Sequence, residues 1–368
     1  MKKIAIMTTP VTTRAYAIRP YETDDDDRRG VLHTPKNITP KIVLNILCIV
    51  FLATSATVND WAARSGFQLL AVSSSAERTA MGGVGAAVGS NFAIYSNPAN
   101  YGIDTTYRIS FEHLWRITHT DLNINRFEIL VPVRTVFMAL SAQNHTVSNI
   151  YIRDFFPGSP PQSGDLSADW QFSQVSLAVG VRRTPTFDWA LSSGLAFDRF
   201  LDEIAYAFIM NAGFVWKLLD DDLRLGLAFN NFGTTTSMIN EDGGREKWGS
   251  GEELPTTIRG GASYSAKIRT IKYNFSTDLL YWHLYDPQEG RAKNFGRRIQ
   301  APVGVQISPA EFISLRGGKT LLADYNVFNF GVGINTKIID FDISTAINKY
   351  ETSVELEWIA GISIGFGR

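Results

Sequence analysis

The stretch from Thr352 to Phe366 places its successive side chains in two different environments, and this alternation limits what the chain can fold into. One face carries Val354, Leu356, Trp358, Ala360, Ile362, Ile364 and Phe366, and the other carries Glu355, Glu357, Ile359, Gly361, Ser363 and Gly365. A period of two is that of a β-strand. The stretch exceeds the mode of about 5–6 residues for globular strands and reaches the roughly 9–11 that a tilted membrane-spanning strand needs. It therefore predicts a strand with one face toward lipid and the other toward a polar interior.

Similar alternation recurs from residue 106 onward and divides the chain into about 14 strands. Tight connections alternate with longer ones, of which the longest are His145–Asp169, Phe232–Pro255 and Tyr285–Arg298. Outer-membrane barrels have short periplasmic turns and longer outer loops, and an even strand number returns the chain to the periplasmic side. We therefore predict an all-β fold, a transmembrane antiparallel β-barrel over 106–368. It would lie in the outer membrane of a Gram-negative-type bacterium, contact outer-membrane lipid and keep both termini in the periplasm.

Charge and residue usage exclude several classes of function. The 35 Lys and Arg residues balance 36 Asp and Glu residues, whereas nucleic-acid-binding proteins carry a basic excess. The single Cys48 cannot form an intramolecular disulfide. The five histidines fall at predicted strand ends or in loops without metal-ligand spacing, and Glu241–Gly244 lacks the spacing of a calcium loop. We expect neither an enzyme nor a cofactor or metal site.

The first 56 residues precede the folded part. Residues 1–41 contain the charge run YETDDDDRRG and predict a disordered leader or a start codon placed too early. Residues 42–56, IVLNILCIVFLATSA, are an apolar run that ends in small residues, which is typical of a signal peptide with its cleavage site. A transmembrane helix is the alternative, but the run is short for the roughly 20 residues required. The bulky Leu47 before Cys48 argues against lipidation.

Residues 57–105 are rich in small side chains, which allow close approach of backbone to backbone, and contain the turn-forming Asn97-Pro98. A ring of 14 strands about 4.8 Å apart and tilted about 40° has a backbone radius of roughly 14 Å, which lining side chains cannot fill. We therefore predict that 57–105 is a plug inside the barrel. The alternative is an ordinary Gly-rich loop.

The segment 73–102, SSSAERTAMGGVGAAVGSNFAIYSNPANYG, resembles the amino-terminal hatch of the PorV/PorQ family, which belongs to the FadL-like outer-membrane barrels. The matching residues are Ala76, Arg78, Ala80, Met81, Gly82, Gly83, Tyr95, Asn97, Pro98 and Ala99. Gly89-Ser90-Asn91 stands where the family has an acidic pair. Leu254–Tyr264 and Phe312–Thr320 resemble two strands of that family, so the resemblance extends from about Phe67 to the end.

The resemblance implies a component associated with type IX secretion, which binds secreted cargo, translocon proteins or attachment-complex subunits through its outer loops. The alternative is a FadL-like transporter of long-chain fatty acids or other hydrophobic compounds, in which a fatty-acid-like ligand binds outside and leaves sideways once the plug shifts. A purely structural barrel is a third hypothesis. One predicted outer loop, Ile150–Gly164, is aromatic and rich in proline. Its Phe155 and Phe156 are candidate contacts for a partner or ligand.

The strand phase also predicts which side chains point inward. The predicted lumen charges are Arg224, Arg259, Asp278, Asp340, Asp342, Glu355 and Glu357, and Glu77 and Arg78 of the plug are possible partners for some of them. Such charges would either hold and release the plug or simply line a polar lumen. Trp115, Trp170 and Trp282 near the outer ends, with Trp189 and Trp216 near the periplasmic ends, predict two interfacial girdles.

Overall fold

The structure is a computed structural model of the chain. It describes residues 67–71, 75–103, 106–117, 121–151, 167–184, 186–200, 203–234, 237–239, 254–283, 299–321, 326–336, 338–349 and 354–366, all within one compact unit. The predicted leader 1–41 and signal peptide 42–56 lie outside these residues, as do Phe155 and Phe156.

Long antiparallel strands make up most of the described chain. The strands are β1 (Tyr107–Ile117), β2 (Asp121–Val133), β3 (Val136–Tyr151), β4 (Ser167–Thr184), β5 (Phe187–Phe200), β6 (Glu203–Leu218), β7 (Leu223–Gly233), β8 (Ser237–Ile239), β9 (Thr256–Ile268), β10 (Ile271–His283), β11 (Ile299–Ala310), β12 (Ile313–Leu321), β13 (Asn326–Asn335), β14 (Ile339–Lys349) and β15 (Val354–Phe366).

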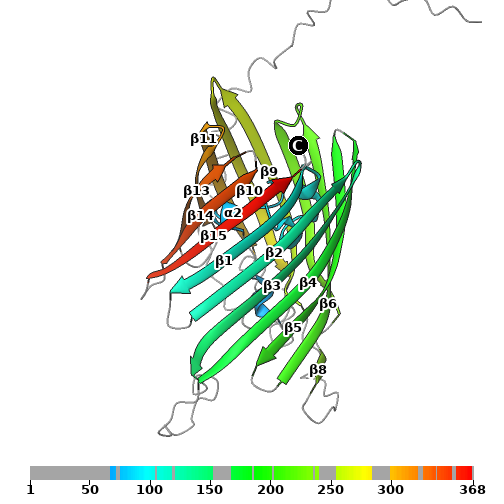
Figure 1. Ribbon diagram of the computed structural model, residues 1–368, viewed down its shortest axis with the longest axis vertical. Coiled ribbons are helices and arrows are strands. Elements are labelled where there is room, and N and C mark those ends of the chain that lie inside the picture. The colour runs from blue at the N-terminus through cyan, green and yellow to red at the C-terminus, as the bar shows by residue number, and fades with distance from the viewer. Residues whose placement is uncertain are drawn as a thin grey trace, which may run out of the picture. The chain divides into compact units, whose positions relative to one another are not determined.

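The first and last strands pair with each other and close the sheet. β1 and β15 are antiparallel, from Tyr107 opposite Phe366 to Ile117 opposite Leu356. The remaining neighbours follow in chain order, including β5 with β6 and β7 with β9, while the short β8 adds to the end of β6. Figure 1 shows these strands tilted side by side. The prediction of a closed antiparallel barrel of 14 strands is confirmed.

The alternation read from the sequence is the alternation of the barrel wall. In β15, Leu356, Ile362 and Phe366 are exposed, whereas Glu357, Ile359 and Gly361 are buried. In β4, Val175, Leu177 and Val179 are exposed between buried Gln174, Ser176 and Ala178. Exposed apolar side chains on the outside of a closed sheet form the surface that hydrocarbon covers in a transmembrane barrel.

Six tight connections join strands at one end of the barrel. They include residues 134–135, 219–222, 269–270 and 311–312, and three of them use non-glycine residues with positive φ, such as Arg134, Asp220 and Arg269. The carboxyl-terminal strand also ends there (Figure 1). We call this the short-turn end and the opposite one the long-loop end.

Two details differ from the sequence-based expectation. β3 continues to Tyr151 because its ladder with β4 resumes after an irregularity between Val147 and Ile150, so His145 lies in a strand, buried, rather than in a loop. Trp170 and Trp282 share the inward phase of their strands, so they do not belong to an interfacial girdle; Trp170 packs in the lumen. Trp216 does face outward and is 40% exposed.

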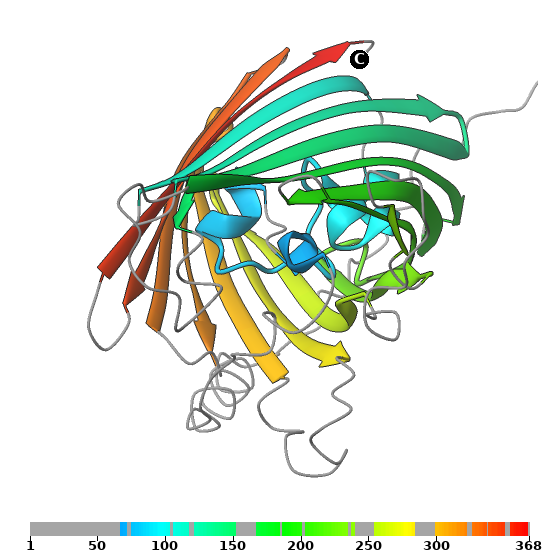
Figure 2. The same ribbon diagram turned by 90° about the horizontal axis from the view of Figure 1, so that it is seen from below.

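Short helical turns occupy the lumen. They are η2 (Gln68–Ala71), α2 (Ala76–Ala80), η3 (Ala93–Tyr95) and η4 (Pro98–Ile103). Figure 2, seen from below Figure 1, shows them within the ring of strands. We call the described residues from 67 to 103 the plug. None of the helices in the described part of the chain is long and apolar enough to cross a membrane.

The outward orientation of alternate apolar side chains leads to a first prediction. Leu177→Arg places a charge on the apolar face in the middle of β4, where Leu177 is 43% exposed, and should destabilise the barrel in a bilayer by about 2–4 kcal/mol. Urea unfolding in lipid vesicles measures this. Leu177→Phe, which keeps the surface apolar, is the control, and equal stability of the two variants would contradict a lipid-facing position.

Candidate functional site

Inward-facing glycines of the wall allow close contact with the backbone of the plug. A Cβ on Gly82 of the plug would lie 2.7 Å from the Lys319 nitrogen in β12 and 2.7 Å from the Val303 oxygen in β11. Conversely, a Cβ on Gly318 would overlap the backbone of Met81 and Gly82. Gly226 stands in the same relation to Ala86. The wall and plug therefore touch through backbone, which only glycine permits.

A charged pair of β9 and β10 holds the next part of the plug. Asp278 Oδ2 accepts hydrogen bonds from the backbone nitrogens of Gly85 at 2.6 Å and Ala86 at 3.0 Å. Arg259 Nη1 donates to the Gly83 carbonyl at 2.7 Å and to Asp278 Oδ2 at 2.9 Å. The two predicted lumen charges thus neutralise each other and satisfy plug amides and a carbonyl together.

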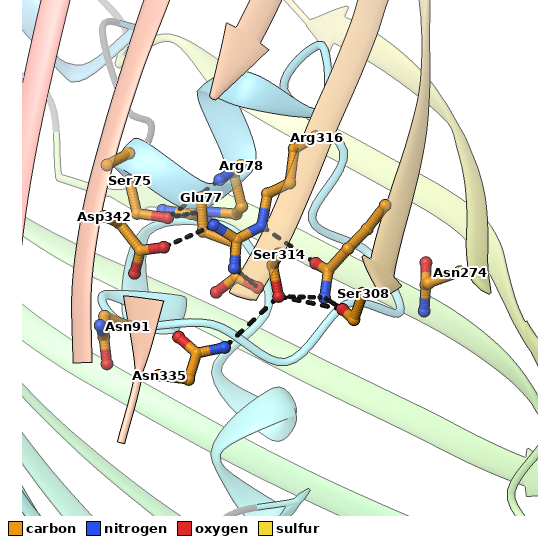
Figure 3. Close-up of polar contacts among 12 residues, drawn as sticks. Ser75, Glu77, Arg78, Asn91, Asn274, Ser308, Ser314, Arg316, Asn335 and Asp342 are labelled. Atoms are coloured by element: carbon orange, nitrogen blue, oxygen red, sulfur yellow. Dashed lines mark hydrogen bonds and ion pairs between the residues drawn. The ribbon is translucent and has the colours of Figure 1, made fainter. Parts of the chain in front are cut away.

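Arg316 of β12 joins plug helix α2 to the wall. It donates to Asp342 of β14 at 2.5 Å, to Glu77 of the plug at 3.2 Å and to Gln306 of β11 at 3.0 Å. Figure 3 shows the guanidinium between Asp342 and Glu77, beside the hydrogen-bonded Ser308 and Ser314. Glu77 therefore has a wall partner, whereas Arg78 bonds within the plug.

Two buried carboxylates hold the opposite side of the plug. Glu112 of β1 accepts a hydrogen bond from the Ala76 nitrogen at 3.0 Å, at the start of α2. Glu128 of β2 accepts from the Phe92 nitrogen at 3.0 Å and from the Tyr101 hydroxyl. The plug is therefore bonded to strands around the ring, from β1 and β2 to β9, β10 and β12.

The residues of the hatch motif stabilise the plug itself. Arg78 donates to Ser75 Oγ at 3.2 Å and to the Phe92 carbonyl at 3.1 Å, and burial lowers the pKa of Arg78 to about 10, so it stays protonated at neutral pH. Asn97 donates to the carbonyls of Ala86 and Phe214, and Pro98 begins η4.

The other motif residues lie against these. Gly82 and Gly83 have φ of +77° and +89°, which ends α2 by turning the chain into the left-handed region. Met81 is fully buried with Val84 and Val88, and the Tyr95 hydroxyl is 2.9 Å from Ser141 Oγ in β3. These positions give each motif residue a role in packing or hydrogen bonding of the plug.

Of the remaining predicted lumen charges, Arg224 and Asp340 line one cavity at the short-turn end. Arg224 pairs with Asp221 of its own turn through two hydrogen bonds, at 2.7 Å and 2.6 Å. Glu357 is buried, and the side chain of Glu355 lies outside the described ones. Sequence reasoning missed Glu112, Glu128 and Arg316, although each alternates with an outward apolar neighbour, which is the signal that identifies an inward residue.

Apolar side chains gather in the lumen on the long-loop side of the plug. Inward side chains of the wall form a cluster with the first residues of the plug, and we call this cluster the apolar chamber. Its members are Phe67, Leu69, Leu70, Ala76, Leu114, Leu122, Ile124, Phe172, Ala196, Ala207, Ile209, Leu254 and Ile359, with Trp170 partly buried against them. Phe67 meets Phe172 edge-on at 6.0 Å, and His145 lies against the same ring at 5.0 Å.

The lumen on the short-turn side is polar. A cavity of about 880 Å³ is lined by both signs of charge, and we call it the vestibule. Its lining includes Glu77, Arg108, Arg224, Lys272, Glu311, Arg316, Asp340 and Asp342. Within the described residues no group of three His, Cys, Asp or Glu side chains is placed to hold a metal ion.

No known protein family and no curated protein matches the sequence. Solved structures do match the fold. The Pseudomonas putida toluene transporter TodX aligns at TM-score 0.56 and 12% identity, over 79% of this chain and 97% of that one. The Ralstonia pickettii toluene transporter TbuX aligns at 0.57 and 11%, over 80% and 98%. The CymD monoaromatic hydrocarbon channel aligns at 0.57 and 10%, over 81% and 98%. At these identities the likeness establishes a shared barrel fold; the PorV/PorQ assignment stays a prediction.

Two adjacent glycines of β12 allow a matched test of the backbone contact between wall and plug. Gly318→Ala should displace the plug, because its Cβ overlaps Gly82 and Met81, whereas Gly317→Ala should not, because its nearest neighbour is Asn329 O at 3.9 Å. Hydrogen exchange of residues 76–86 measures the displacement. Equal protection of the plug in both variants would contradict a close contact between Gly318 and the plug.

Arg316→Gln should loosen the plug while the barrel stays folded. It leaves the carboxylates of Glu77 and Asp342 without their cation, and breaking a buried pair costs about 3–5 kcal/mol. Ion conductance in planar bilayers should rise. Arg224→Gln is the control because Arg224 pairs with Asp221 at the turn and not with the plug. A tight channel in Arg316→Gln would show that the other anchors suffice.

Proposed function

We propose that this chain is an integral outer-membrane protein that binds a hydrophobic compound in the apolar chamber and passes it toward the membrane. The observation that carries the proposal is the chamber itself. Leu122, Ile124 and Phe172 point into the barrel from three positions and are at most 4% exposed. Water-filled barrels have polar interiors, so an apolar lumen fits an apolar ligand.

The division of the lumen supports a sideways route of passage. Wall residues bond the plug on several sides, and the vestibule beyond it is charged. A hydrophobic molecule gains about 25 cal/mol for each Å² of apolar surface buried in the chamber and would lose that gain in the vestibule. Sideways exit into the bilayer, after the plug shifts, is the route that keeps the compound in apolar surroundings. Because outer-membrane barrels have their short turns in the periplasm, the start of β1 and the end of β15, which lie at the short-turn end, would be periplasmic.

The solved structures support this function over the one implied by the hatch motif. Two of them are described as toluene transporters and one as a monoaromatic hydrocarbon channel. Their likeness to this chain is one of fold, so the compound class for this protein remains a proposal based on the chamber. An enzyme activity is not part of the proposal, because binding and release require no bond chemistry.

The secretion hypothesis rests on the sequence resemblance alone. It assigns protein binding to the outer loops, including Phe155 and Phe156, which are outside the described residues. Purification in mild detergent followed by mass spectrometry separates the two hypotheses. Copurifying lipid-like molecules support transport, whereas recovery of large secreted proteins or translocon subunits would support a type IX secretion component.

A chamber variant tests the proposed function directly. Ile124→Asn places an amide where Ile124 is fully buried, and it should weaken binding of an apolar compound such as decane about 5- to 150-fold, because an unpaired buried amide costs roughly 1–3 kcal/mol. Calorimetric titration of the protein in lipid nanodiscs measures the affinity, and empty nanodiscs correct for partitioning.

Lys272→Ala in the vestibule is the matched control, because Lys272 lies on the other side of the plug, is not one of its anchors and should leave the affinity unchanged. If neither wild type nor variant binds decane or another hydrophobic compound, the proposed function is wrong.

A further inference from the structure

A small cavity lies inside the barrel between the plug and the wall strands β7, β9, β10, β11 and β12. Its volume is about 140 Å³. Leu70 lines it and also belongs to the cluster of the apolar chamber, so the cavity borders that cluster at this side chain. We call this cavity the inner pocket.

Three polar atoms of residues that line the inner pocket are buried and have no hydrogen-bond partner among the described residues. They are Asn230 Oδ1, Arg259 Nε and Trp282 Nε1. Asn230 is 3% exposed, and its amide orientation is fixed because Nδ2 donates to the Ser96 carbonyl at 2.9 Å. Its Oδ1 is therefore an acceptor. A buried unpaired polar atom costs about 1–3 kcal/mol, so three around one cavity indicate a missing partner.

The unsatisfied atoms comprise one acceptor and two donors. A hydroxyl group offers the complement, with one O–H to donate and two lone pairs to accept. An alkane offers neither, and a ketone lacks the donor that Asn230 Oδ1 requires. The set of atoms therefore matches an alcohol or a phenol.

Charge argues against a carboxylate in the same place. Among the described lining residues Arg259 is the one cation, and it already pairs with Asp278 at 2.9 Å. Asp278 in turn accepts two plug amides. A bound carboxylate would add an unpaired negative charge near Asp278 in a buried space, which is costly, whereas a neutral hydroxyl leaves the balance intact.

We propose that the inner pocket binds the hydroxyl group of a hydrophobic alcohol or phenol, whose apolar part extends past Leu70 into the apolar chamber. This inference rests on the proposed function, since it specifies the class of compound that the chamber receives. Trp282 and Asn230 determine the preference for a hydroxyl, and the chamber supplies the apolar affinity.

The experiment compares decane, 1-decanol and decanoate by calorimetric titration of the full protein in lipid nanodiscs. The expected order of affinity is decanol first, with decane and decanoate weaker. Trp282→Phe removes the unpaired N–H and keeps an aromatic ring, so it should weaken decanol binding about 5- to 10-fold and leave decane unchanged. Trp216→Phe is the control, because that indole faces outward and does not line the pocket.

The outcomes distinguish failure of the hydroxyl site from failure of the proposed function. Decane and decanol binding equally well, or decanoate binding tightest, overturns the hydroxyl site and leaves the chamber's function standing. Binding of none of the three overturns both. A crystal structure grown with decanol that shows only water in the inner pocket also overturns the inference, whereas a hydroxyl within hydrogen-bonding distance of Trp282 Nε1 supports it.

Discussion

Closure of the sheet is the constraint on which the rest of the structure depends. Because β1 pairs with β15 along its full length, each of the 14 strands of the ring has two neighbours, and among the described strands the short β8 alone pairs on one side, with β6. The same closure leaves a lumen of roughly 14 Å backbone radius, which the lining side chains cannot fill. The plug therefore follows from the strand number, and a polypeptide packed inside a barrel must find partners for its own backbone.

The plug meets that requirement in two ways. Where its backbone touches the wall, glycines such as Gly226 and Gly318 make room. Where its amides and carbonyls would be unpaired, inward charges supply partners, as Asp278 does for Gly85 and Ala86 and Arg259 does for Gly83. Buried charge in the wall is thus matched to backbone polarity in the plug.

The plug also separates an apolar part of the lumen from a polar part. On its long-loop side Leu122, Ile124 and Phe172 exclude water, and on its short-turn side charged side chains line the vestibule. The inner pocket borders the apolar cluster at Leu70, and Trp282 and Asn230 among its lining residues carry unpaired polar atoms. A compound with an apolar body and one hydroxyl group would satisfy both environments at once.

Period-two alternation determined the barrel, its strand number and the outward face, because one-residue phase decides whether a side chain meets lipid or lumen. It also placed Arg259, Asp278 and Asp342 inside. Sequence could not reveal which inward charge meets which plug atom, since Arg316 and Glu77 are 239 residues apart and their pairing depends on where the plug sits. The same phase also places Trp170 and Trp282 inside, although their nearness to the strand ends predicted an interfacial girdle. Sequence could not show which inward side chains pack together as the apolar chamber. Those features arise because strands distant in sequence converge on one lumen, and only the tertiary structure decides what they enclose.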